Sequence, residues 1–79
     1  MKSEEAFGTI LKQIRLNKGF SQELLAHKSD LDRTFISMLE RGQRQPSLTS
    51  ILAISSSLEI PAYKFIKLTT DLMDENNKK

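Results

Sequence analysis

Apolar residues recur along this chain three or four positions apart, which is the spacing of helices that bury one face. No segment alternates apolar and polar residues as a half-buried strand would. In the first helix, predicted over residues 3–18, Ser3 is placed to cap the start and Gly19 to end it. Its buried face is expected to contain Phe7, Ile10, Leu11 and Ile14.

Residues 21–42 predict two short helices joined by a tight turn. Ser21 is suited to cap the first helix and Asp32 the second, because their side-chain oxygens accept from free amides of the first turn. Starts about eleven residues apart leave room for about two helical turns and a short connection. Asp30 is the residue of that connection best able to adopt the left-handed conformation. The second helix is predicted from about Asp32 to Arg41, with Gly42 as its C-cap.

The remaining chain predicts two more helices. Ser47 is placed to cap a helix over residues 48–57, and Pro61 suits the start of another from about Ala62 to Met73. The fourth helix is expected to bury Leu48, Ile51 and Leu52, together with Leu58. Apolar side chains of the fifth helix spread around more than one face, so the surplus is expected to contact a second copy of the chain. The predicted interface residues are Tyr63, Phe65, Ile66 and Leu72.

Five helices in 79 residues predict an all-α fold, a compact five-helix bundle that contains a helix-turn-helix. Residues 1–79 are expected to form a single domain, with a folded core at about 3–73. Residues 74–79 are polar with nothing to bury, so we expect this tail to fray.

The predicted outward face of the third helix carries few groups typical of a solvated helix. It presents Arg33, Thr34, Ser37 and Arg41, where Glu and Lys would be more usual. Guanidinium and hydroxyl groups reach guanine edges, thymine methyl groups and phosphates. The pattern therefore indicates a helix that lies in a DNA major groove.

Charge supports this interpretation only locally. The formal net charge is +2, from twelve basic and ten acidic residues. Residues 41–45 carry two arginines and no acid, and with Arg33, Lys28 and Lys18 they predict a basic surface. An ordinary solvated surface is the alternative.

Composition argues against catalytic and membrane functions. Without cysteine the chain has no disulfide, thiolate nucleophile or zinc finger. His27 is the only histidine and has no partners at ligand spacing, so we expect no metal site, no cofactor and no catalytic residue. One small domain leaves little room for an enzyme pocket. No apolar run approaches the ~20 residues of a membrane span, and MKSEEAF lacks the apolar region of a signal peptide. A cytoplasmic protein is therefore expected.

The helix order and the segments SQELLA, LDRTFIS, LERGQRQPS and LEIP resemble the Cro/phage-repressor (XRE) helix-turn-helix family over about residues 7–68. Within it, LDRTFISMLERGQRQPSL is most similar to controller proteins of restriction–modification systems. The resemblance implies a lambda repressor-like domain that regulates transcription as a homodimer, on a pseudo-palindromic operator in double-stranded DNA. RNA polymerase is a further candidate partner, and no small-molecule ligand is expected.

The resemblance also implies roles for individual residues. It assigns base reading to Arg33 and Thr34, and contact with bases or backbone to Ser37. The predicted DNA-backbone contacts are Gln22, Arg41, Gln43 and Arg44. For Arg41 the alternative is that it complements the C-terminus of its own helix.

Two further positions match residues of this family that form a partly buried ion pair between the first and third helices, Arg15 and Glu40. The chain also departs from the family at two positions. Phe35 stands where controllers usually have Tyr, which removes a hydroxyl contact to phosphate. Asp30 replaces the usual glycine of the turn, at some expected loss of stability.

Other functions remain open from the sequence. A phage or plasmid repressor, or an antitoxin that regulates its own operon, would share most of this pattern. A different class is an all-α protein-interaction module without DNA binding. Such a module would present an apolar or acidic face on the third helix, and Arg33, Thr34, Ser37 and Arg41 argue against it.

Overall fold

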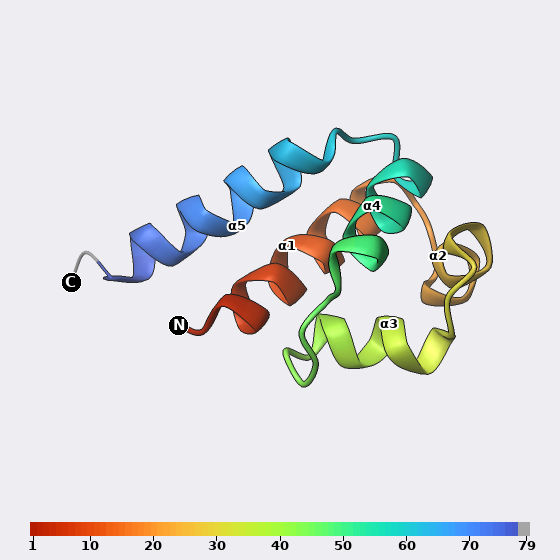
Figure 1. Cartoon of the computed structure of the whole chain (residues 1–79), viewed down its shortest axis with the longest axis horizontal. Coiled ribbons are helices and arrows are strands. Elements are labelled where there is room, and N and C mark those ends of the chain that lie inside the picture. The colour runs from red at the N-terminus through yellow and green to blue at the C-terminus, as the bar shows by residue number, and fades with distance from the viewer. Residues whose placement is uncertain (78–79) are drawn as a thin grey trace.

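Five helices with short connections make up the computed structural model, which describes residues 1–77 (Figure 1). They are α1 (Ser3–Asn17), α2 (Gln22–Ser29), α3 (Arg33–Glu40), α4 (Leu48–Ser57) and α5 (Ala62–Asn77). No residue from 1 to 77 lies in a strand. The all-α, five-helix prediction is confirmed. None of the helices within this range is long and apolar enough to cross a membrane.

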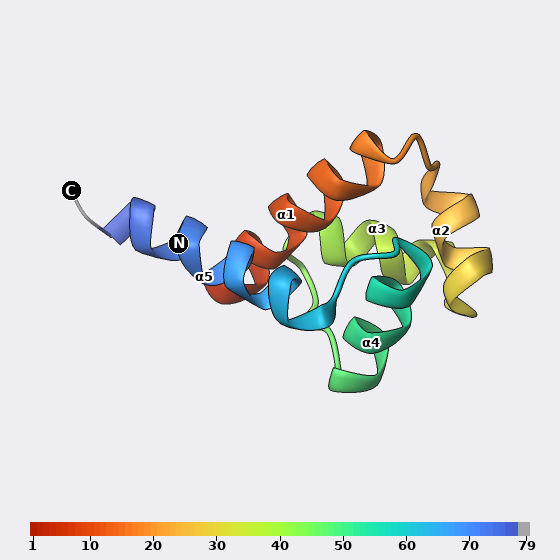
Figure 2. The same ribbon diagram turned by 90° about the horizontal axis from the view of Figure 1, so that it is seen from above.

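Helix α1 lies between α3 and α5 and packs against both. Helix α2 packs on α3 and α4, and α4 closes against α5, so the chain surrounds one core (Figures 1 and 2). The largest fully buried side chains are Phe65, Leu11, Leu25, Ile36, Leu39, Ile54 and Leu58. Because α3 is held only along its Ile36 and Leu39 side, its other face is left outside the core.

Side-chain caps set the starts of α2 and α4 as predicted. The Leu24 amide donates to the Ser21 hydroxyl at 3.0 Å, and the Ser50 amide donates to the Ser47 hydroxyl at 3.1 Å. Helix α3 also begins after its predicted cap, Asp32, but the carboxylate of that residue makes no capping hydrogen bond.

The predicted cap of α1 is wrong. Ser3 is the first residue inside the helix, and Lys2 holds the N-cap position. The Lys2 backbone amide donates to the Glu5 carboxylate at 2.8 Å, so the helix start is stabilised by a glutamate three residues downstream. Any residue except proline can donate its backbone amide in this way, so the type of side chain at Ser3 did not indicate where the helix begins.

Two acidic residues take the left-handed conformation after a helix. Asp30 has φ 55° after α2, as predicted, and the Leu31 amide then donates to the Ala26 carbonyl at 2.9 Å. Glu59 has φ 56° after α4, a position that the sequence did not suggest. After α3 the C-cap is Arg41, and Gly42 follows it with φ 70°. The hydrogen bonds made in these turns satisfy carbonyls at the helix ends.

Gly8 allows α1 and α3 to approach closely. A Cβ atom at this position would collide with the backbone carbonyl oxygens of Leu39 and Glu40. Backbone atoms cannot rotate away as a side chain can, so a larger residue would force the two helices apart. The contact fixes the distance of α3 from the core.

The predicted buried face of α4 is wrong in part. Leu48 and Leu52 are 71% and 52% exposed, whereas Ile54 and Leu58 have no exposed surface. Apolar residues occur around most of this short helix, so spacing alone did not determine which side meets the core. The consequence is an exposed apolar surface on α4.

Helix α5 also corrects the sequence prediction. Phe65 is fully buried and stacks on Phe7 with ring centroids 4.8 Å apart, so it is a core residue that is not available to a partner. Leu72 is partly buried against the same core. Of the four predicted interface residues, Tyr63 and Ile66 are exposed, at 76% and 43%. The helix continues through residues 74–77, which were expected to fray; residues 78 and 79 of the predicted tail lie outside the described residues.

Candidate nucleic-acid interface

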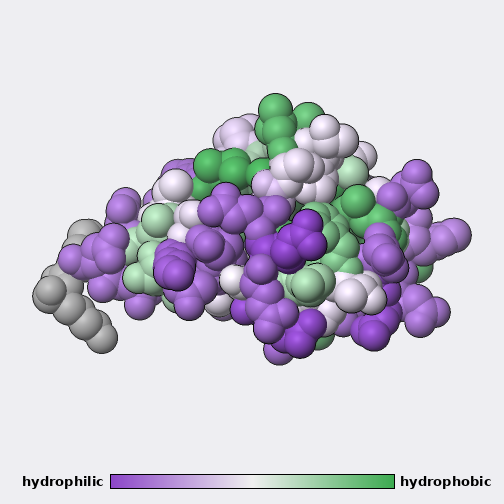
Figure 3. Space-filling model, turned by 60° about the horizontal axis from the view of Figure 1, so that its bottom comes forward, coloured by the Kyte–Doolittle hydropathy of each residue, from purple (hydrophilic) through white to green (hydrophobic). Residues whose placement is uncertain are grey.

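Helix α3 lies at the edge of the fold (Figure 1). Its buried side chains are Ile36 and Leu39, one helical turn apart, and they anchor it to the core. Arg33 and Thr34 are exposed at its start, and Ser37 is half-buried one turn further on. Figure 3 turns this side toward the reader and shows a largely hydrophilic surface interrupted by small apolar areas. The predicted base-reading residues therefore share one outward face.

A buried ion pair fixes α3 to α1. The Arg15 guanidinium donates from Nε and Nη2 to the two oxygens of Glu40, and the two side chains are 8% and 3% exposed. A third bond runs from Arg15 Nη1 to the Phe20 carbonyl at 2.7 Å, in the connection before α2. The ion pair predicted between Arg15 and Glu40 is confirmed. It joins α1, α3 and the start of α2 at one point.

Gln22 extends this network to the surface. Its side-chain nitrogen donates to Glu40 Oε1 at 3.0 Å, and its oxygen accepts from Arg33 Nη1 at 3.2 Å. The sequence identified Gln22 only through its predicted phosphate contact. Gln22 lies on α2, whereas Arg33 and Glu40 lie on α3, so the periodicity of a single helix could not have revealed these two bonds.

The connection after α3 carries the other predicted DNA-backbone residues. Arg41, Gln43 and Arg44 are all exposed. The Arg44 guanidinium lies over the ring of Phe35, 5.6 Å from its centroid, which draws this connection toward the first half of α3. Phe35 thus has a structural role that does not require the hydroxyl of a tyrosine.

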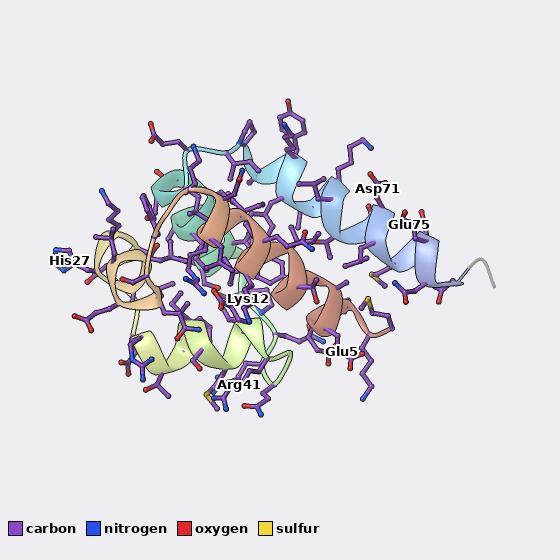
Figure 4. All side chains as sticks on the ribbon, turned by 180° about the vertical axis from the view of Figure 1, so that it is seen from behind. Glu5, Lys12, His27, Arg41, Asp71 and Glu75 are labelled. Atoms are coloured by element: carbon purple, nitrogen blue, oxygen red, sulfur yellow. The ribbon has the colours of Figure 1, made fainter. Side chains whose placement is uncertain are left out.

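Arg41 has a contact that favours its alternative role. Its Nε donates to the Ser37 carbonyl at 3.3 Å, near the C-terminal end of α3, where a positive charge is favourable. The side chain lies on the outer side of α3, away from α1 (Figure 4). It can therefore complement its helix while remaining close to the proposed DNA surface.

The assembled surface offers hydrogen-bond donors and positive charge rather than reactive groups. Arg33, Arg41 and Arg44 supply three guanidinium groups, and the one acid at the end of α3, Glu40, is already paired with Arg15. Within residues 1–77 no cluster of His, Asp or Glu is placed to hold a metal ion. His27 is exposed on α2 and points away from the core (Figure 4). This chemistry suits recognition of a polyanion.

Comparison with known proteins gives one consistent result. The helix-turn-helix family model matches residues 11–65. Control protein C.BamHI from Bacillus amyloliquefaciens is 46% identical over 65 residues, which cover 81% of this chain and 80% of that protein.

Two solved structures of restriction–modification controller proteins are also similar. C.AhdI from Aeromonas hydrophila superposes with a TM-score of 0.77 at 42% identity, over 78% of this chain and 94% of that one. C.Esp1396I superposes with a TM-score of 0.85 at 35% identity, over 95% and 97%. The similarity extends beyond the two helices of the motif to nearly the whole described fold.

Proposed function

The chain belongs to the helix-turn-helix family of DNA-binding transcription regulators, and we propose that it is a homodimeric controller protein of a restriction–modification system. Proteins of this family are regulators and not enzymes. Beyond family membership, three features are proposed for this protein: α3 reads the DNA, a homodimer carries two copies of that helix, and the regulated operon encodes a restriction–modification system.

The outward face of α3 is the main observation that supports a DNA-reading role for this helix. Arg33 and Thr34 stand exposed at the start of a helix whose opposite side is fixed by buried Ile36 and Leu39. A helix of this width fits the major groove of B-DNA, where arginine donates two bonds to guanine and hydroxyl or methyl groups contact other base edges. Arg33 and Thr34 therefore supply much of the specificity, with Ser37 as a further contact.

Backbone contacts flank this helix on both sides. Gln22 lies at the start of α2, where free amides and the helix dipole favour a phosphate. Gln43 and Arg44 lie exposed after α3, and Arg41 precedes them. Phosphate contacts of this kind give affinity without sequence preference and weaken strongly as salt concentration rises.

The apolar surface that the fold leaves exposed supports a homodimer. Leu48 and Leu52 on α4 and Tyr63 and Ile66 on α5 are all exposed, and hydrophobic groups appear along the upper edge of Figure 3, on the side where α4 lies. Ile66 also lines a mostly apolar hollow of about 240 Å³ between α1, α5 and the connection before α4. Burial of this surface against a second copy would add to the small core of a 79-residue domain.

A two-fold dimer of this kind has a geometric requirement. Each subunit places its α3 in one major groove, and the two grooves on one side of the duplex are about 34 Å apart. The operator is then a pseudo-palindrome with half-sites one helical turn apart, because the symmetry of the protein is imposed on the DNA.

The controller role rests on the named relatives. C.AhdI and C.Esp1396I are restriction–modification controller proteins, and C.BamHI is a control protein; this chain is 42%, 35% and 46% identical to them. A regulator of this kind acts in the cytoplasm, where its promoter is located, and RNA polymerase is its candidate partner. Methyltransferase and endonuclease genes next to its own gene are expected.

Selection of bound sequences from a random duplex pool, at near-physiological salt, tests the proposal. Enrichment of a symmetric motif that also occurs upstream of the gene for this protein is the expected result. Weak binding that disappears as salt rises, without any enriched motif, would contradict it and favour a protein-interaction module.

Sedimentation equilibrium tests the dimer separately. Leu52→Glu places a charge in the proposed α4–α5 interface and should shift the wild-type dimer to monomer. Leu16→Glu is a matched control, because Leu16 is similarly exposed, at 57%, on α1. A monomeric wild type, or a dimer that is unaffected by Leu52→Glu, would show that this surface is not the interface.

A further inference from the structure

Helix α3 carries an apolar side chain, Met38, that lies outside the core. The buried residues of this helix are Ile36 and Leu39, and Phe35 packs against the same core from a partly buried position. Met38 is also half-buried, but within the described part of the chain it is not among the apolar side chains that pack against the core. Its apolar surface is therefore available for a contact outside the core.

The geometry of α3 places Met38 on the side that faces away from the core. Successive residues of an α-helix are rotated by about 100°, and the core direction lies midway between Ile36 and Leu39. Thr34 then points almost directly away from the core, and Ser37 and Met38 lie about 50° to either side of that outward direction. Met38 is thus as central to the outward face as Ser37, whereas only polar residues were predicted there.

The backbone around Met38 is held firmly. Its carbonyl accepts a hydrogen bond from the Gln43 amide at 2.9 Å, and the next residue, Leu39, is fully buried. A side chain presented from a fixed helix meets its partner at a defined place. Arg33 lies about 7.5 Å away along the helix axis, at 1.5 Å per residue, and successive base pairs are about 3.4 Å apart. The two residues are therefore placed to meet different base pairs.

We infer that Met38 reads a thymine in each half-site through the C5-methyl group of that base. Of the four bases, thymine alone presents a methyl group in the major groove, where the other edges offer donors and acceptors. The methionine side chain has no donor and only a weak acceptor, so a polar base edge buried against it would lose its hydrogen bonds to water without replacement. The inference rests on the proposed position of α3 in the major groove, and it adds the kind of base that this part of the helix selects.

The test removes one methyl group from the DNA and the matching side chain from the protein. Each thymine of the selected operator is replaced in turn by uracil, in one half-site at a time, and wild type and Met38→Ala are titrated with every duplex. One replacement should weaken binding of the wild type by roughly three- to fivefold, the effect of one methyl group withdrawn from an apolar contact. Met38→Ala should not respond to that same replacement, because the contact is already absent.

Two further variants are controls. Leu16→Ala removes an apolar side chain that is 57% exposed on α1, and it should respond to every replacement as wild type does. Met38→Leu keeps an apolar side chain of similar volume and should retain part of the response. Because Met38 lies outside the core, Met38→Ala should unfold at nearly the same urea concentration as wild type.

The inference is overturned if wild type responds to no uracil replacement, or if Met38→Ala responds to all of them as wild type does. A large loss of stability in Met38→Ala, with equal weakening on all duplexes, would also overturn it and assign Met38 to the fold. Arg33→Ala tests the proposed function separately. If its loss is confined to one base pair while residue 38 has no effect, α3 still reads DNA and only the role of Met38 fails. If the selection yields no operator at all, the proposed function fails, and the inference fails with it.

Discussion

Removal of the buried Glu40 carboxylate should strongly destabilise this protein. Glu40→Ala removes the counterion of Arg15, whose side chain is only 8% exposed in the folded protein. Arg15 donates two hydrogen bonds to Glu40, and bonds that involve charged groups contribute about 1.5–3 kcal/mol each. The bond from Arg15 to the Phe20 carbonyl would survive, so we expect a loss of about 3–5 kcal/mol, the range found when one partner of a buried pair is removed.

That loss is large relative to the stability available. A domain of 79 residues has a free energy of unfolding of about 4–12 kcal/mol at 0.05–0.15 kcal/mol per residue. Urea unfolding followed by helical circular dichroism measures the difference, provided that wild type and variant unfold in a single transition. Glu40→Ala should unfold at a much lower urea concentration than wild type.

A double variant separates the charge from the packing. Arg15→Met combined with Glu40→Leu replaces the pair with apolar side chains, and such replacements are often neutral or stabilising. We expect it to recover most of the loss caused by Glu40→Ala, since Gln22 and the Phe20 carbonyl lie near enough to the surface for water to replace their bonds. A loss below about 1 kcal/mol for Glu40→Ala, or a double variant less stable than the single one, would refute the reasoning.

Three further predictions concern the turns, the helix contact and the DNA backbone. Gly8→Ala should lower the free energy of unfolding by about 2 kcal/mol or more, because the added Cβ meets backbone oxygens of α3; urea unfolding equal to wild type would contradict the close contact. Asp30→Gly and Glu59→Gly should each raise the free energy of unfolding by about 0.5–1 kcal/mol, because both residues have positive φ. If neither substitution raises it, neither turn is strained. Arg44→Ala should weaken binding to cognate and random duplexes equally in fluorescence anisotropy, and it should lower the slope of log affinity against log salt concentration by about 1. Phe35→Leu, which removes the ring beneath Arg44, should cause a smaller uniform loss of affinity. A loss of affinity for the cognate duplex alone would assign Arg44 to base reading.

Local signals in the sequence predicted the helix starts well where a side chain does the capping. Ser21 and Ser47 cap as expected, and Asp30 takes the left-handed turn. The same reasoning was wrong at Ser3, where the Lys2 backbone amide and a downstream glutamate form the cap. Glu59 was missed because glutamate carries no preference for positive φ.

The faces of α4 and α5 could not be predicted from spacing. Leu48 and Leu52 follow the spacing of a buried stripe, yet they are exposed, because Ile54 of the same helix faces the core instead. Leu58, at the C-cap of α4, is buried as predicted. Phe65 was assigned to a dimer surface and proved to stack on Phe7. When apolar residues lie on several sides of a helix, tertiary packing decides which side is buried.

Some features of the candidate site could be predicted from the sequence, and others could not. The outward position of Arg33 and Thr34 follows from helical periodicity, and the Arg15–Glu40 pair followed from family resemblance. The bonds that join Gln22 to Glu40 and Arg33 depend on how two separate helices, α2 and α3, meet, and only the folded structure reveals them.

The most direct test of the central claim is an NMR titration of the isotope-labelled protein with its selected operator. Our account predicts the largest backbone changes at residues 33–37, with smaller changes at Gln22 and at Gln43 and Arg44. Changes confined to α4 and α5, with α3 unaffected, would contradict the claim that α3 is the element that reads DNA.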